Sequence, residues 1–318
     1  GYWNTAVGDT ALLENTTGII NTAFGKGALS ANITGGTNTA VGGGALAYNV
    51  DGSSNSAFGA EAMSSNMSGS YNVAIGQRSL YSNASGSNNI GIGSSSFGTT
   101  TATSSGDNNI GIGINSLFNN ITGYDNTALG TNSLTGNVSG SQNVAVGNGA
   151  LQSNTSATSN TAVGFLALTT TTTGGNNAAF GEGSLQGNTT GYSNAAFGRR
   201  SLFSNDTGFY NSSFGYHSLY SNTDGYENSA FGSGAMLNTT SGIHNAAFGN
   251  DALGSNTVGG QNVAIGHSAL NSLTATSSTN VAIGFQSGTS QTFGSNNIFL
   301  GYNTAVASTT GSNQLSIG

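Results

Sequence analysis

The amino-acid sequence predicts an all-β fold, a parallel β-solenoid of about 18 coils with 17 residues in each coil. The first observation is a pentapeptide, Asn-x-Ala-(large apolar residue)-Gly, that begins at Asn4 and returns along the whole chain to a degenerate last copy at Gln314. Of its 18 intervals, 16 are 17 residues long, one is 20 and one is 18. A chain with such a period builds a stack of similar units and not a globule around one core.

The second observation is the pattern within one repeat, whose columns we number one to seventeen from the motif Asn. The first five columns alternate with a period of two, as a strand does. In the well-preserved copy 21–37 this strand covers residues 21–25, and we expect a second short strand over columns eight to eleven, residues 28–31. The segment 32–35, Asn-Ile-Thr-Gly, has the residues of a turn.

The third observation is that helix is excluded. The Gly in column five of every repeat costs roughly 1 kcal/mol against Ala in a helix, and column fifteen usually adds another. The chain has no Pro, which suits strands that pair on both sides. We expect the Asn residues of columns one and twelve to form ladders of amide groups from coil to coil.

Only columns four and nine are regularly large and apolar, so we expect these two columns to form the core. The small residues of columns three and five suggest close approach of another backbone. Two core side chains are few for ordering 17 residues, which costs on the order of 20 kcal/mol. We therefore expect several chains to pack side by side, with the Ala/Gly face or column two at the interface.

No boundary interrupts the period, so the sequence predicts a single repeat domain over residues 1–318. The two longer intervals place irregular spacers near residues 98–106 and 271–279. We expect these spacers to bulge as loops without shifting the strands.

Composition excludes several classes of function. The net charge of −7, with four basic side chains and no basic stripe, argues against nucleic-acid binding. No apolar run approaches the ~18 residues of a membrane-spanning helix, so membrane insertion is not expected. The chain has no Cys and therefore no thiol chemistry or disulfides.

The repeated motif, as in residues 21–37, resembles the head repeats of YadA-like trimeric autotransporter adhesins. It is also similar to repeats in chaperone-terminated phage tail fibres and bacterial surface proteins, and residues 311–318 resemble the segment where such repeats end. The resemblance implies a left-handed β-roll in a side-by-side homotrimer. It also implies an extracellular location, on a cell surface or a virion.

The sequence offers one candidate binding surface, where aromatic and basic residues gather in variable columns. Exposed aromatic rings beside Arg suit stacking on sugars or docking on a protein, although the same rings also suit packing between coils or protomers. Tyr192, Phe209 and Tyr226 share one column, as a stacked ladder would. The candidate residues are Tyr192, Arg199, Arg200, Phe203, Tyr216, His217, Tyr220 and Tyr226.

No residue set predicts catalysis, a cofactor or a metal site. The acidic residues are scattered over several columns, and His217, His244 and His267 do not line up from coil to coil. Nine Asn-x-Ser/Thr sequons lie in column twelve, where Asn and Thr also suffice to close the turn.

We therefore predict a structural fibre, an adhesin shaft or head that presents a rigid, multivalent binding surface and is not an enzyme. Its expected partners are its own copies, as a homotrimer and possible filament, and a glycan or protein receptor on a host surface. A polysaccharide-depolymerising tail spike is the alternative, for which Glu182 and Asp206 are the best, though poorly matched, carboxylate pair. An ice-binding solenoid is the second alternative, because Thr and Ser recur in columns two and fourteen.

Overall fold

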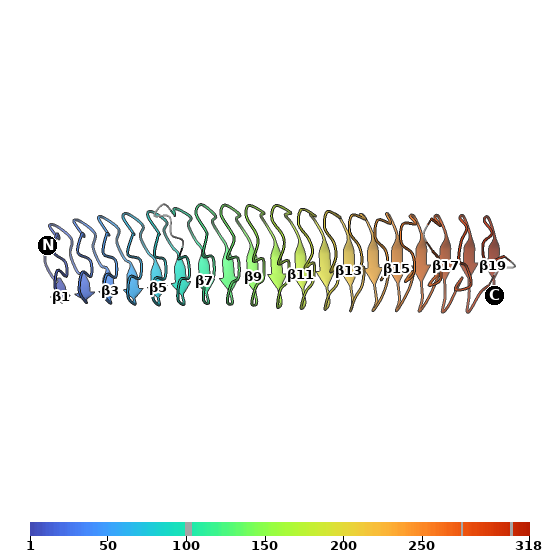
Figure 1. Ribbon diagram of the computed structural model, residues 1–318, viewed down its shortest axis with the longest axis horizontal. Helices are drawn as coiled ribbons and strands as arrows, with labels where there is room; N and C mark the ends of the chain where they lie inside the picture. The colour runs from blue at the N-terminus through green and yellow to red at the C-terminus, as the bar shows by residue number, and fades with distance from the viewer. Residues whose placement is uncertain (99–103, 275, 306–307) are drawn as a thin grey trace. The chain divides into compact units, whose positions relative to one another are not determined.

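The computed structural model describes residues 1–98, 104–274, 276–305 and 308–318, which form parallel β-strands and turns without any helix. The chain divides into two compact units, Gly1–Ser159 and Asn160–Gly318, each a parallel β-solenoid. Within each unit, consecutive strands lie side by side and point the same way (Figure 1). The all-β solenoid is thus confirmed.

Every strand spans columns two to four and is three residues long. The first unit holds β1 (Thr5–Val7), β2 (Thr22–Phe24), β3 (Thr39–Val41), β4 (Ser56–Phe58), β5 (Val73–Ile75), β6 (Ile90–Ile92), β7 (Ile110–Ile112), β8 (Thr127–Leu129) and β9 (Val144–Val146). The second unit holds β10 (Thr161–Val163), β11 (Ala178–Phe180), β12 (Ala195–Phe197), β13 (Ser212–Phe214), β14 (Ser229–Phe231), β15 (Ala246–Phe248), β16 (Val263–Ile265), β17 (Val281–Ile283), β18 (Ile298–Leu300) and β19 (Leu315–Ile317).

The strands stay in register across both longer intervals, as predicted. Ile90 pairs with Ile110 across the 20-residue interval, and Val263 pairs with Val281 across the 18-residue interval. The predicted bulges fall largely on residues 99–103 and on residue 275, which lie outside the described residues.

The expected core was wrong in one column. Column nine is buried, as expected, but column four faces outward: Phe24 is 56% exposed and Phe180 is 36% exposed. The neighbouring column three takes its place, since Ala23 and Ala179 are fully buried. Column three of the Ala/Gly face therefore does not meet another chain, because it faces the inside of its own coil, whereas the Gly of column five is half-buried.

The reason for the small third column is that the opposite wall of the coil lies very close. A Cβ added at Gly91, in column three, would lie 2.6 Å from the Oγ atom of Ser79 and 3.1 Å from the Cγ atom of Leu80. These two residues stand in columns eight and nine of the preceding coil, and Ser79 Oγ donates a hydrogen bond of 2.8 Å to the Gly91 carbonyl. A large side chain in column three has no room there.

Two exceptions show how tightly this interior is packed. Where column nine is the larger Phe97, column three of the next coil is Gly111, and a Cβ there would lie 2.8 Å from the Phe97 ring. Where column nine is Gly288, column three of the next coil is Phe299, which is fully buried and fills the space. The loss of the column-nine Leu at Gly288 is therefore compensated by Phe299.

The second strand expected over columns eight to eleven was also wrong, because this segment is a series of turns. Met63 of column nine has φ 51°, and Glu61 of column seven, just before the segment, has φ 57°, so the backbone here cannot form a regular strand. It still bonds from coil to coil, as Leu12 N–H does to the Ala28 carbonyl at 3.0 Å. From Leu12 to Leu270, column nine has φ near +50° and accordingly contains Leu, Met and Phe but no β-branched residue.

The predicted Asn ladders are confirmed in both columns. In column one, Asn4 Oδ1 accepts the backbone N–H of Asn21 at 2.8 Å, and Asn21 Nδ2 donates to the Gly35 carbonyl at 2.9 Å. In column twelve, Asn49 Nδ2 donates to Asn32 Oδ1 at 2.7 Å, and Asn32 Nδ2 donates to the same Gly35 carbonyl at 2.9 Å. The two ladders satisfy buried polar groups that the short strands leave unpaired.

Candidate functional site

Six of the eight candidate residues form one cluster on two consecutive coils of the second unit. Columns six and seven follow the Gly at the end of β12 and β13, and column ten lies in the turn segment beyond them. These columns carry the pairs Arg199 and Tyr216, Arg200 and His217, and Phe203 and Tyr220. Side chains in one column meet because consecutive coils lie one strand spacing apart.

The positive charge of Arg199 is paired with an acidic side chain. Its Nε lies 3.0 Å from Glu182 Oε2, and this hydrogen bond lowers the pKa of the Glu182 carboxyl while raising that of the Arg199 guanidinium. Both side chains are about half exposed, so the pair contributes little to stability. Arg199 also lies over the Tyr216 ring, with its Cζ 5.9 Å from the ring centroid.

Arg200 has no carboxylate partner within 4 Å among the described residues. Its Cζ lies 5.5 Å from the centroid of the Phe203 ring. This cation is therefore the free charge of the cluster, on a chain whose net charge is −7.

His217 lies between two Tyr rings. Its ring centroid is 3.8 Å from that of Tyr216, in a stacked arrangement, and 4.7 Å from that of Tyr220. Burial, and then the charges of Arg200 and Arg199, lower the pKa of the imidazole. Its Nε2 is buried without a hydrogen-bond partner in the described structure. The lowered pKa favours the neutral imidazole, and the two ring contacts make His217 a packing residue.

The other two candidates, Tyr192 and Tyr226, belong to a separate stack. The Phe209 ring lies between them, 5.0 Å from Tyr192 and 4.7 Å from Tyr226, with interplanar angles of 3° and 4°. This confirms the predicted ladder in column sixteen. Among the ring contacts of the described residues, none joins this stack to the Arg200 cluster.

Most of these rings therefore have their faces against one another, which reduces the area that a ligand can stack on. The Phe203 and Tyr220 rings are likewise stacked, 5.1 Å apart. The surface remains a candidate for binding through ring edges, Tyr hydroxyls and Arg200. The contact geometry itself fits the packing interpretation of these residues.

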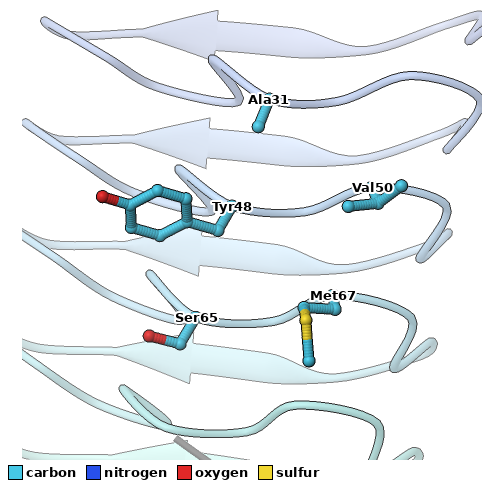
Figure 2. A pocket seen from close by; sticks show the side chains of 5 residues that line it. All are labelled: Ala31, Tyr48, Val50, Ser65 and Met67. Atoms are coloured by element: carbon cyan, nitrogen blue, oxygen red, sulfur yellow. The ribbon is translucent and has the colours of Figure 1, made fainter.

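A hollow in the first unit contains an aromatic ring that the sequence did not single out. Tyr48 is 63% exposed, and in column eleven its neighbours are the small residues Ala31 and Ser65. With Val50 and Met67 of column thirteen, these residues line a hollow of about 390 Å³ (Figure 2). The signal that could have found it is a single Tyr in a column of small residues.

The remaining chemistry-bearing residues are structural in their contacts. The sequon residue Asn32 is fully buried, like Asn66 and Asn137, and each donates its amide to the column-twelve ladder. Such side chains are inaccessible to glycosylation once the coils have formed. In the alternative carboxylate pair, Glu182 is bound to Arg199, and Asp206 accepts a hydrogen bond from the Thr189 hydroxyl.

The described residues contain no group of three or more His, Asp or Glu placed to hold a metal ion. Over the same residues, no helix is long and apolar enough to cross a membrane. Comparison with protein-family models and with curated proteins finds no match to this chain.

Proposed function

We propose that this chain is a structural fibre segment whose coils pack side by side with copies of the same chain. The observation that carries the proposal is a size relationship on the outward face of the strands, between columns two and four. Wherever column four is Phe, column two is Thr, Ser or Ala; these pairs are Thr22 with Phe24, Ser56 with Phe58, Ala178 with Phe180, Ala195 with Phe197, Ser212 with Phe214, Ser229 with Phe231 and Ala246 with Phe248.

In the other twelve coils column four is Val, Ile or Leu, and column two is never Ala or Ser. Here column two contains Thr, Val, Ile or Leu, as in Val73 with Ile75 and Ile90 with Ile92. The largest residue of column four, Phe, is therefore never joined by a large residue in column two of the same coil. A side chain that only faces water needs no such compensation, because water fills any shape.

The interior of the coil supports this interpretation, because it follows the same rule. Phe97 is matched by Gly111, and Gly288 by Phe299, where close packing of the two walls requires it. Close-packed contacts are sensitive to a single methylene, so compensation of this kind is typical of filled space. By the same argument, columns two and four lie against another surface.

A copy of the same chain is the occupant that fits best. The compensation acts within one coil, and in a parallel, in-register assembly each coil meets the same coil of its partners. The face is also a continuous apolar row, with Phe58, Ile75 and Leu129 each more than 40% exposed in the single chain. Rows of this kind are typical of interaction sites.

In this proposal the assembly is a homotrimer of left-handed β-rolls at a cell or virion surface, where it serves as an adhesive shaft or head. The resemblance to YadA-like heads supports the number of chains, the handedness and the location. Repetition of the outer columns gives many equal contacts, so weak individual sites add to useful avidity.

A double-mutant cycle tests the packed face. Ser212→Val crowds the Phe214 coil, Phe214→Ile leaves it underfilled, and the double variant reproduces the Val/Ile pair found at Val73 and Ile75. We expect each single variant to lower the unfolding midpoint of the assembly and the double variant to restore most of the loss, with a coupling of about 1 kcal/mol or more. Single-variant effects near zero, with no coupling between them, would show that the face is free and would overturn the packed interface.

A further inference from the structure

The Tyr48 hollow differs from the Arg200 cluster and the column-sixteen stack because its ring is not stacked. Among the described residues no second ring contacts Tyr48, whereas the rings of Phe203, Phe209 and Tyr216 each contact another. The neighbours of Tyr48 along its column are Ala31 and Ser65, which are too small to cover it. A flat, apolar ring face is therefore available, with 63% of the residue exposed.

The lining of the hollow is apolar on one side and hydroxyl-bearing on the other. Figure 2 shows Val50 and Met67 together on one side, and the hydroxyl groups of Tyr48 and Ser65 pointing in the same direction on the other. None of the five lining residues carries a charge. On a chain of net charge −7, an uncharged lining of this kind suits a neutral ligand.

The size of the hollow fits one small ring. Its volume of about 390 Å³ is within the range of small-molecule sites. A pyranose has an apolar C–H face and a rim of hydroxyl groups, and this matches a ring platform beside two hydroxyls.

We propose that Tyr48, Ser65 and Met67 form a subsite for one neutral pyranose ring of a surface glycan. The sugar stacks on the Tyr48 ring, its edge contacts Met67, and its hydroxyls bond to Ser65 Oγ and Tyr48 Oη. This inference rests on the adhesive part of the proposed function, and it assigns that role to a residue of the first unit. Copies of the site on assembled chains act together, so that a weak single site suffices.

The test is saturation-transfer NMR of the full chain with the methyl glycosides of glucose, galactose, mannose and N-acetylglucosamine. We expect saturable transfer to the ring protons of at least one of them. Tyr48→Ala should weaken its binding about three- to tenfold, as loss of a ring contact does, and Tyr48→Trp should retain it. The matched control is Tyr71→Ala, which removes a 66% exposed Tyr from the same unit, outside the hollow, and should leave binding unchanged.

Three results would overturn the subsite: no saturable transfer from any glycoside, equal binding by Tyr48→Ala, or equal loss in Tyr71→Ala. Transfer to N-acetyltyrosine amide in place of the glycosides would assign the hollow to a peptide side chain and would also overturn it. Sedimentation of the same samples distinguishes failure of the subsite from failure of the proposed assembly. An intact oligomer without sugar binding removes the subsite alone, and a monomer removes the packed face.

Discussion

The units Gly1–Ser159 and Asn160–Gly318 share one coil but differ in which of their ladders are continuous. In the first unit the column-twelve amides form an unbroken series from Asn15 to Asn83. In the second unit Thr239 and Leu273 interrupt that series, and Asn222 Oδ1 and Asn256 Oδ1 are left buried without a donor, as Asn154 Oδ1 is in the first unit.

On the outward face the difference is reversed. The second unit carries five consecutive Phe rings in column four, stacked at centroid distances of 4.7–4.9 Å: Phe180, Phe197, Phe214, Phe231 and Phe248. In the first unit Phe24 and Phe58 stand in separate coils among Val, Ile and Leu. The buried columns three and nine are thus alike in both units, whereas column twelve and the outward column four differ between them.

The largest expected effect tests whether the inner columns are equivalent in both units. Column-five Gly25 and Gly198 have φ of 138° and 133°, and an added Cβ would lie 2.5 Å from a carbonyl oxygen of the next coil in each case. Gly25→Ala and Gly198→Ala should each cost at least about 3 kcal/mol, measured by urea unfolding.

Gly43→Ala is the control, because a Cβ there meets only the Lys26 carbonyl at 4.0 Å, and it should change stability by no more than about 0.5 kcal/mol. A mild effect at Gly25 with a severe one at Gly198 would show that the two units are not built on the same coil.

The next effect concerns the left-handed backbone of column nine. Leu202 has φ 52° and is fully buried. Leu202→Ile keeps the volume but adds a β-branch, so it should destabilise the fold by about 2 kcal/mol, whereas Leu202→Met should cost less than about 1 kcal/mol. The natural Met63 and Met236 occupy the same column. Equal costs for Ile and Met in thermal unfolding would contradict this backbone conformation.

A smaller and stabilising effect is expected where the second unit lacks its amide ladder. Thr239→Asn should give Asn222 Oδ1 a donor and restore the arrangement seen at Asn49, and so raise the free energy of unfolding by about 1 kcal/mol. Thr240→Asn, one residue away in an outward column, is the matched control and should give no gain. If neither variant changes the free energy of unfolding, the interrupted ladder does not limit the stability of the second unit.

The smallest effect is a pH dependence confined to the second unit, which contains all three His residues of the chain. The pKa of His217 is lowered in the folded protein, so the unfolded chain binds the proton more readily. The stability that His217 contributes is therefore complete above the usual His pKa. It is lost as the pH falls through the lower pKa that His217 has in the folded protein. NMR titration of the His217 ring should show this, and amide exchange in the first unit should stay constant over that range.

The sequence predicted the strand of columns two to four, its register, both Asn ladders and the buried ninth column, because each depends on a residue type at a fixed period, but its second strand over columns eight to eleven was wrong. It misplaced column four, because alternation tells which residues share a face of a strand but not which face points inward. The burial of column three follows from the distance between the two walls, and only the contacts of residues such as Gly91 and Ser79 reveal that distance.

The candidate site was predicted with mixed success for a similar reason. The period assigns each aromatic residue to a column, and the shared column of Tyr192, Phe209 and Tyr226 correctly predicted their stack. It could not tell a ring with covered faces, such as that of Tyr216, from one with an open face, such as that of Tyr48. That difference depends on how the side chains of adjacent coils lean, which the period does not determine.

The central claim is that columns two and four pack against copies of the same chain. The mass of the assembled particle tests this claim most directly. Sedimentation equilibrium of the intact chain should give three times the 31.4 kDa chain mass, and Phe214→Asp should shift it toward the single chain. A particle of 31.4 kDa at all concentrations, with the coils folded, would contradict the claim and leave the size compensation between the two columns without an explanation.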